Sequence, residues 1–283
     1  MTATTPTTAE RFSYLLIDGA LLADVKLQVK VSQQERPSWL IPLYLEEAVQ
    51  VSPWLIDIGC ALRDEALEEV MNLANALRPQ LHLSVIDSQL EPADLVHHLR
   101  HFIFVFVNTD EQRTLRFADC VILPVLRKVF TLEQWKTFTG PIDRWLVHDR
   151  AGAMVNLVQV QPNIRTVPPP LVLSGEQQTV LEEATEPDSA IAWVRNKRLG
   201  DELPGSVTQQ HQWASTAHSI WRNVGRRELT SYYLLTLGFF DTLGSIAEHR
   251  ELSAIMLAPD IDTFRLKLTE LVERVRSAQE LVS

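Results

Sequence analysis

Asp94, His97 and His101 are the residues of this sequence whose types and spacing come nearest to a metal-binding set. They stand at i, i+3 and i+7, so on a helix they share one face and bring a carboxylate and two imidazoles together. A divalent metal bound there would point to a small metal-dependent hydrolase. We favour a helix that packs on its apolar residues and keeps these histidines at the surface, because no third imidazole or thiol has an evident reason to converge on that face.

Several common sequence motifs of catalysis and cofactor binding are absent. The ten glycines form no G-x-G-x-x-G pattern, and Gly200 and Gly205 have P-loop spacing without the lysine that should follow. Neither a G-x-S-x-G nucleophile elbow nor an H-E-x-x-H zinc motif occurs. We therefore expect a protein that is not an enzyme and that carries no metal and no cofactor.

Composition and charge narrow the class of protein further. The chain has 283 residues, of which 46% are hydrophobic, and a formal net charge of −10. The length favours two domains, and the composition is that of an ordinary soluble globular protein. The acidic charge argues against a nucleic-acid binder, since neutralising phosphates needs a basic face. No run approaches the roughly 18–20 apolar residues of a membrane helix, so we expect no membrane insertion.

The N-terminal residues and the two cysteines bear on the compartment. Residues 1–12 lack the basic start and the apolar stretch of a secretory signal, and we expect a disordered tail there. Cys60 and Cys120 both stand in apolar surroundings. In the absence of an export signal, free buried thiols are favoured over a disulfide. We expect a cytoplasmic protein.

Short apolar runs alternate with amphipathic stretches between residues 13 and 160. The runs predict strands at 14–17, 40–44, 54–58, 81–86, 102–107 and 114–117. The stretches predict helices at 62–77, 92–101 and 120–129. The capping-box pattern from Thr131 to Gln134 predicts the start of another helix. This alternation indicates an α/β (α+β) domain over 13–160, with a mixed sheet covered by helices.

An acidic run lies in the helix expected at 62–77. It comprises Asp64, Glu65, Glu68 and Glu69. The apolar residues of the same stretch recur at helical spacing: Leu62, Ala66, Leu67, Val70, Met71, Ala74 and Leu77. We expect the apolar side chains to face the protein and the carboxylates to form a solvated outer face.

The sequence changes character after residue 160. Three successive prolines from Pro168 to Pro170 favour an extended segment, and we expect 161–173 to link two domains. The pattern from Ser174 to Gln177 is a capping box. The periodicity then predicts helices at 176–184, 188–198, 209–223, 227–241, 245–257 and 262–281. We expect an all-α helical bundle over 174–283, with the strongly apolar helix 227–241 at its centre.

The last expected helix carries an apolar seam. Phe264, Leu268, Leu271 and Val275 lie on it, spaced by three and four residues like the a and d positions of a coiled coil. Most amphipathic helices bury such a stripe in their own domain, and we favour that interpretation. The alternative is a docking face for a partner helix. These four residues are therefore candidates for partner binding.

Tryptophans and arginines gather near the helix expected at 209–223. Trp213 and Trp221 lie on that helix, and Arg226 and Arg227 follow it. Trp and Arg dominate the hot spots of protein interfaces. We add these four residues to the candidates for partner binding.

Several short motifs follow one another between residues 13 and 145. They are Tyr14-Leu-Leu-Ile-Asp18-Gly19-Ala20, Leu43-Tyr44, Ser52-Pro53-Trp54-Leu55, Ser88, His98-Leu99-Arg100, Leu115-Arg116-Phe117-Ala118-Asp119, Leu123-Pro124, Phe138-Thr139-Gly140-Pro141 and Trp145. In order and spacing this set resembles the domain of type VI secretion adaptor proteins. These chaperones, often called Tap or Tec, load toxic effectors onto the VgrG spike.

The resemblance implies an adaptor that binds an effector, through the effector's hydrophobic N-terminal part, and delivers it to VgrG for secretion. It also implies a helical region after the motifs. One position departs from the family pattern. Members usually have proline directly after the Asp of the Arg-aromatic-x-Asp motif, where this chain has Cys120. We expect the turn into the next helix to be less rigid here.

Arg116 and Asp119 of that motif are present. A pair between them, or one made by Arg100, would clamp the end of a strand to the helix below it, and we interpret these residues as structural. Two domains would provide the two faces that an adaptor needs. Besides the metal-dependent hydrolase, a structural subunit of the secretion machine remains an alternative function.

Overall fold

The computed structural model of the chain describes residues 11–22, 36–44, 46–77, 80–107, 111–158, 169–198 and 202–281. Contacts divide the chain into two compact units, unit 1 (Met1–Leu181) and unit 2 (Glu182–Ser283). Residues 1–10 of the expected tail and residues 161–168 of the expected linker lie outside the described residues.

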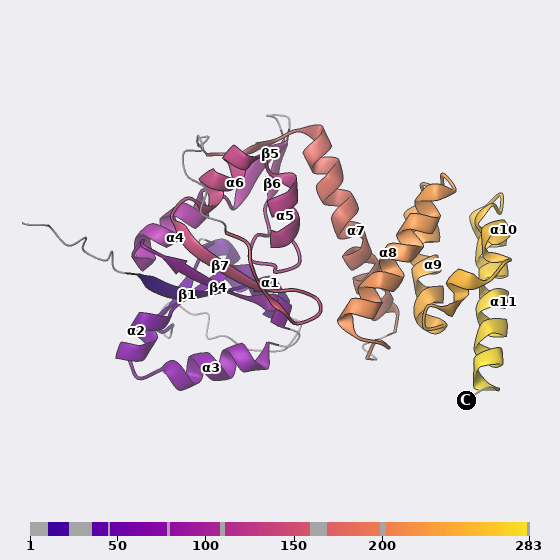
Figure 1. Ribbon diagram of the computed structural model, residues 1–283, viewed down its shortest axis with the longest axis horizontal. Coiled ribbons are helices and arrows are strands. Elements are labelled where there is room, and N and C mark those ends of the chain that lie inside the picture. The colour runs from indigo at the N-terminus through magenta and orange to yellow at the C-terminus, as the bar shows by residue number, and fades with distance from the viewer. Residues whose placement is uncertain are drawn as a thin grey trace, which may run out of the picture. The chain divides into compact units, whose positions relative to one another are not determined.

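A six-stranded antiparallel sheet forms the centre of unit 1 (Figure 1). In spatial order its strands are β2 (Leu40–Pro42), β3 (Trp54–Asp57), β1 (Phe12–Ile17), β4 (Leu83–Ser88), β7 (Ile142–His148) and β8 (Met154–Asn156). Successive side chains of a strand point to opposite faces. Accordingly, Tyr14 and Leu16 of β1 enter one core, and Leu15 and Ile17 enter another.

A second, three-stranded sheet is mixed. Its order is β6 (Glu111–Thr114), β5 (Phe104–Val107) and β9 (Val172–Leu173), with β5 antiparallel to β6 and parallel to β9. The strand predicted at 114–117 was therefore misplaced. The residues of β6 are exposed and polar, so they carry no apolar alternation, whereas the buried Leu115 and Phe117 lie in the segment after the strand.

Helices cover both faces of the large sheet (Figure 1). On one face, α4 (Pro92–Arg100), α5 (Leu123–Val129) and α6 (Leu132–Thr139) contribute to the core that contains Tyr14. On the other, α2 (Ile58–Arg63) and α3 (Leu67–Ala76) contribute to the core that contains Ile17. The described part of the unit also contains the short helical segments α1 (Gly19–Leu22), η2 (Glu46–Val51) and η3 (Gln80–His82) and the start of α7 (Gly175–Lys197). The predicted α/β domain with a helix-covered sheet is confirmed.

The capping box before α6 is also confirmed. Thr131 Oγ1 accepts from the Gln134 N–H at 3.2 Å, and Gln134 Oε1 accepts from the Thr131 N–H at 2.9 Å. The helix predicted at 120–129 begins later than expected, because α5 starts at Leu123. Asp119 makes the turn before it, where its Oδ1 accepts from the Val121 N–H at 2.8 Å.

The helix predicted at 62–77 is two helices joined at a corner. The α2 helix ends at Arg63, and α3 begins at Leu67. Glu65, between them, has a φ of 58°, a left-handed conformation that no helix interior tolerates. The prediction that all apolar residues of this stretch face inward was wrong, because the corner turns three of them outward: Leu62, Leu67 and Met71.

Unit 2 is helical, as predicted. Its elements are the C-terminal part of α7 (Gly175–Lys197), α8 (Val207–Asn223), α9 (Leu229–Asp241), η4 (Ser245–Glu248), α10 (Leu252–Met256) and α11 (Ile261–Glu280). Two predicted helices merge into α7, which accommodates the buried Pro187 in its interior. The capping box at its start is present, because Ser174 Oγ accepts from the Gln177 N–H at 3.2 Å.

The apolar helix α9 lies at the centre of unit 2, as predicted. It contacts α8, α11 and η4, and Tyr232, Leu235 and Phe239 on it are buried. The helix α7 contributes a buried stripe of Ala190 and Val194 to this unit. Within the described ranges, no helix is long and apolar enough to cross a membrane.

Candidate functional site

Several of the motif residues gather at one end of the six-stranded sheet, whereas Ser88 and Pro141 lie at its opposite end. In β1, Ile17 pairs with Trp54 at the start of β3 and with Leu83 at the start of β4, while Pro42 at the end of β2 also pairs with Trp54. Antiparallel register therefore brings the residues after β1, after β2 and before β3 to the same end of the sheet. Asp18-Gly19, Leu43-Tyr44 and Ser52-Pro53 occupy these positions.

An ionic cluster forms at this end. The Arg116 Nη2 atom lies 2.9 Å from Asp18 Oδ2 and 3.5 Å from Asp119 Oδ2. The Asp18 side chain is 5% exposed and that of Arg116 is 48% exposed. Burial alone would lower the pKa of Arg116, but the charge of Asp18 and its hydrogen bond outweigh burial, and the pKa is raised. Arg116 is therefore a charged group that Asp18 holds in place, while about half of its side chain stays accessible to solvent.

Backbone donors hold the two carboxylates in place. Asp18 Oδ1 accepts from the Ala20 N–H at 2.9 Å, and Asp119 is held through the Val121 N–H. The predicted pair of Arg116 with Asp119 exists, but Asp18 is the nearer partner, and the sequence reasoning missed it. The sequence signal for Asp18 was its position directly after a buried strand. Nothing in the sequence indicated which basic residue it would contact.

Ser52 and Gly19 bring two loops into close contact. Ser52 Oγ accepts from the N–H groups of Leu43 and Tyr44, both at 2.9 Å, and donates to the carbonyl of Pro53 at 2.6 Å. A Cβ at Gly19 would lie 1.9 Å from the Ser52 carbonyl oxygen, so only glycine fits there. Burial, followed by the charge of Asp18, raises the pKa of Tyr44.

Arg100 has a different role from the ion pair considered for it. Its Nε donates to the Leu43 carbonyl at 3.0 Å, and its Nη2 donates to the Pro42 carbonyl at 3.2 Å. It thereby ties the end of β2 to α4. These bonds suit a guanidinium because the carbonyls at the end of a strand lack ladder partners.

Cys120 occupies the position at which the resemblance implies a proline. Its N–H donates to the Leu81 carbonyl at 3.2 Å, and its Sγ donates to the Leu83 carbonyl at 3.2 Å. Burial, followed by the charge of Asp119, raises the pKa of this thiol. Both cysteines are free thiols, as predicted, with Cys120 buried and Cys60 partly buried. A proline at 120 could make neither of these two bonds.

The candidate metal residues do not converge. Asp94 and His97 on α4 and His101 at its C-cap are exposed, and the His97 and His101 rings meet edge to face with their centres 4.5 Å apart. His98, on another face of the helix, is held by the Phe138 carbonyl at 2.8 Å through Nε2. In the ranges that the structure describes, no three His, Cys, Asp or Glu side chains are grouped to hold a metal ion.

The seam of α11 is mostly internal. Phe264, Leu268 and Leu271 are buried in the core of unit 2. This burial agrees with the favoured interpretation that the stripe packs within its own domain, and a partner would have to open the core to touch these three side chains. Val275 is half-buried and lines a shallow hollow of about 600 Å³ on unit 2. The other lining residues are Ser245, Glu248, His249, Arg274, Ala278 and Gln279.

The tryptophan and arginine candidates are also mainly structural. Trp221 is buried and stacks on Tyr232 at 5.4 Å, and the half-buried Trp213 meets Phe240 edge to face. Arg226 donates from Nε to the Met256 carbonyl at 2.7 Å and lies 4.9 Å from the centre of the Phe264 ring. Arg227 alone of the four is exposed.

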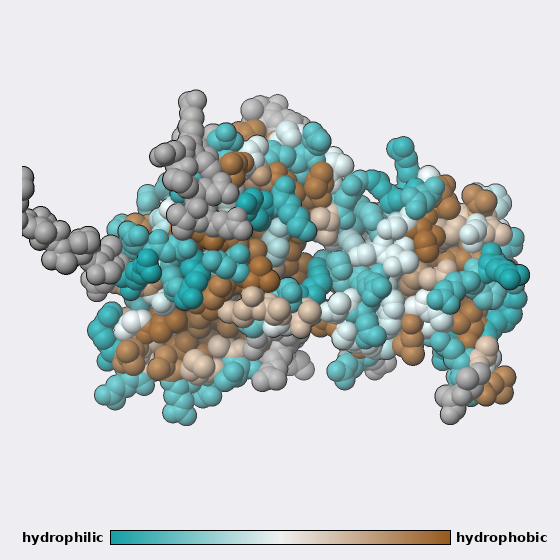
Figure 2. Space-filling view, viewed as in Figure 1, coloured by the Kyte–Doolittle hydropathy of each residue, from teal (hydrophilic) through white to brown (hydrophobic). Residues whose placement is uncertain are grey.

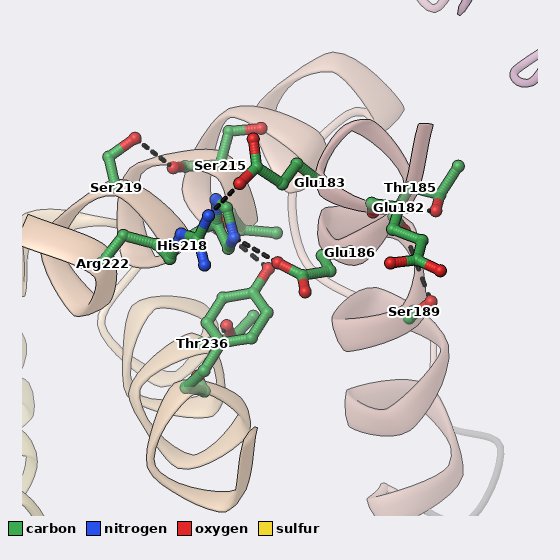
Figure 3. A network of polar contacts seen from close by, with 12 residues as sticks. Glu182, Glu183, Thr185, Glu186, Ser189, Ser215, His218, Ser219, Arg222 and Thr236 are labelled. Carbon is green, nitrogen blue, oxygen red and sulfur yellow. Dashed lines mark hydrogen bonds and ion pairs between the residues drawn. The ribbon is translucent and has the colours of Figure 1, made fainter. Parts of the chain in front are cut away.

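A polar network that the sequence did not indicate joins α7 to α8 within unit 2 (Figure 3). Glu186 pairs with His218, and Glu183 pairs with Arg222. The His218 ring also lies 5.6 Å from Trp221 and 5.3 Å from Tyr232. These pairs hold the two helices in register. Their partners are more than 30 positions apart, which is why no local pattern predicted them.

Comparison with known proteins identifies a domain family in the N-terminal half of the chain. Residues 13–137 match the family model of a domain of unknown function, DUF4123. No curated protein and no solved structure matches the chain. The matched range contains Asp18, Arg100, Arg116 and Asp119, and it ends within α6. The ionic cluster at the sheet end and the loops that frame it therefore lie in the part of the chain that this domain family covers.

Proposed function

We propose that this protein is an adaptor of a type VI secretion system. It binds an effector and delivers it to the VgrG spike, acting in the cytoplasm before secretion and making or breaking no covalent bond. The observation that carries the proposal is the match of residues 13–137, because DUF4123 is generally associated with effector adaptors of this system. The motifs that carry the resemblance lie in or beside that range.

The site is consistent with binding rather than turnover. Arg116 is held by two carboxylates that are themselves fixed by backbone donors. A charged group positioned in advance loses little conformational entropy when a partner contacts it. Release of the effector requires a reversible complex, and interfaces of about 800 Å² per partner span micromolar to picomolar affinities.

We assign the two partners to different units. Unit 1 carries the family match and is proposed to meet the spike. Unit 2 is proposed to hold the hydrophobic N-terminal part of the effector, and the hollow lined by Val275 and Ala278 supports this assignment because it leaves the end of the α11 seam open. Two separate partners require two separate surfaces, which two compact units provide.

Purification from cells that carry the secretion cluster tests the proposal. The tagged full chain should recover an effector and VgrG together, and deletion of its gene should stop secretion of that effector alone. Recovery of neither partner would refute the adaptor function. A structural subunit would instead be retained in the assembled particle, and its loss would stop secretion of every effector.

A further inference from the structure

The corner between α2 and α3 exposes large apolar side chains that the core does not need. Leu62 is 61% exposed, Met71 is 51% exposed and Leu67 is 37% exposed. On the inner side of the same two helices, Ala61 and Val70 already fill the core. Figure 2 shows hydrophobic atoms over this region of unit 1, with hydrophilic atoms beside them. Apolar surface gathered in this way is typical of interaction sites.

Carboxylates flank these apolar side chains. Asp64, Glu65, Glu68 and Glu69 are all exposed, with Arg63 as the one basic residue between Leu62 and Met71. Among the described residues, no ion pair joins these four carboxylates to a basic side chain. No metal-holding group of three ligands occurs in the same ranges. The corner therefore combines apolar contact area with a net negative rim.

The corner is also held in one conformation. The Ala66 N–H donates to the Ala61 carbonyl at 2.8 Å, and Ser38 Oγ donates to Asp64 Oδ2 at 2.6 Å. The Asp57 side chain caps α2 by accepting from the Cys60 N–H at 3.0 Å. A surface fixed in this way loses little entropy on binding.

We propose that the α2–α3 corner, residues 62–71, docks a segment of the spike protein that carries large apolar side chains flanked by lysine or arginine. Charge complementarity selects this occupant, because the rim attracts basic groups while Leu62, Leu67 and Met71 bury apolar ones. An anionic membrane surface and a nucleic acid are both repelled by the same rim.

The choice of the spike rests on the proposed function. The corner lies inside residues 13–137, the range that the domain family covers. The proposed function assigns the spike to unit 1, so a docking surface within this range is assigned to the spike. Unit 2, which lies outside the match, is left for the effector.

Two double variants of the full chain test the apolar part and the charged part of the docking surface separately. Leu62→Ser with Met71→Ser removes apolar contact area. Glu68→Lys with Glu69→Lys reverses the charge of two rim residues. The matched control is Glu270→Lys with Glu273→Lys, which makes the same change of net charge at two residues exposed on α11. Each protein is titrated with purified VgrG and, separately, with the purified effector.

We expect both corner variants to weaken VgrG binding by about tenfold or more, the loss typical of central interface residues. The control and all effector affinities should stay unchanged. Raising the salt concentration should weaken binding of the unmodified chain and have less effect on the charge-reversed variant. Since all substituted side chains at the corner are exposed, the circular dichroism spectrum should be unaltered.

Unchanged VgrG affinity in both corner variants overturns this inference and leaves the adaptor function standing. An equal loss in the α11 control also overturns it, because attraction would then depend on total charge. If the unmodified chain binds neither VgrG nor the effector, the adaptor function itself fails, and the docking surface fails with it.

Discussion

At the scale of single residues, the motif side chains hold backbone rather than react. Ser52 satisfies two N–H groups, and Arg100 satisfies two carbonyls at the end of a strand. Buried polar groups of this kind are costly to leave unpaired, so each such residue fixes a loop. Arg116 differs, because it is fixed by carboxylates on one side while about half of its side chain stays accessible.

The pair of Arg116 with Asp18 gives a prediction at this scale. Arg116→Met leaves the nearly buried Asp18 carboxylate without its nearest cation. We expect the free energy of unfolding of unit 1 to fall by about 1–3 kcal/mol, less than for a fully buried pair because solvent reaches the guanidinium. Urea unfolding of the two single variants and of Arg116→Met/Asp18→Asn measures the coupling. A coupling free energy near zero would contradict the assigned pairing.

The same cluster shows what the sequence could predict about the site. Asp119 lies three positions from Arg116, so their pairing follows from local geometry. Asp18 lies 98 positions away, and only the register of β1 against its neighbours brings it to Arg116. The sequence therefore predicted half of the cluster, and the other half required the topology of the sheet.

At the scale of elements, local signals were reliable and boundaries between elements were not. The Thr131 and Ser174 capping boxes predicted helix starts because all their bonds lie within four residues. The corner at Glu65 was missed because glutamate carries no signal for a left-handed conformation. Without that corner, Leu62, Leu67 and Met71 fitted an inward-facing helical stripe. Because the corner at Glu65 was not predicted, the candidate docking surface was not predicted either.

The cap of α11 gives a prediction of pH dependence. Asp260 Oδ1 accepts from the Thr263 N–H at 2.8 Å, and this hydrogen bond is the largest cause that lowers the pKa of Asp260 below its ordinary value. A lowered pKa in the folded state means that ionised Asp260 stabilises α11 above the unfolded pKa. That contribution is lost as pH falls through the folded pKa.

Asp260→Asn keeps a capping acceptor but cannot titrate. We expect its midpoint of thermal unfolding to fall less than that of the unmodified chain when the pH is lowered from 6 to below the ordinary carboxyl range. Thermal unfolding followed by circular dichroism at several pH values provides the comparison. Parallel pH profiles for the two proteins would show that this cap does not contribute to the acid sensitivity of unit 2.

At the scale of the whole molecule, two units with separate cores predict separate unfolding. Leu271 is fully buried in unit 2, and Leu271→Asp places a carboxylate there without a partner. Such substitutions cost several kcal/mol and commonly unfold a small domain. We expect unit 2 to unfold while unit 1 keeps its amide protection in hydrogen exchange. Loss of protection in both units would mean that their stabilities are coupled.

The assignment of the effector to unit 2 yields a prediction at the end of the α11 seam. Val275 and Ala278 line the open hollow at the end of the α11 seam, where the half-buried Val275 packs on the rim of the unit 2 core. A charge at these positions removes apolar contact area from the hollow, and the circular dichroism spectrum checks that unit 2 stays folded. We expect Val275→Glu/Ala278→Glu to weaken effector binding by about tenfold or more, because apolar contacts at the centre of an interface carry much of its affinity. VgrG binding should be unchanged, since that partner is assigned to unit 1.

The matched control is Leu266→Glu/Ser277→Glu, because both residues are exposed on α11 outside the hollow. The unmodified chain, the hollow variant and the control variant are each titrated with purified effector by isothermal titration calorimetry. Equal effector affinities for all three proteins would show that the effector binds another surface. A loss of affinity in the control variant alone would exclude the hollow.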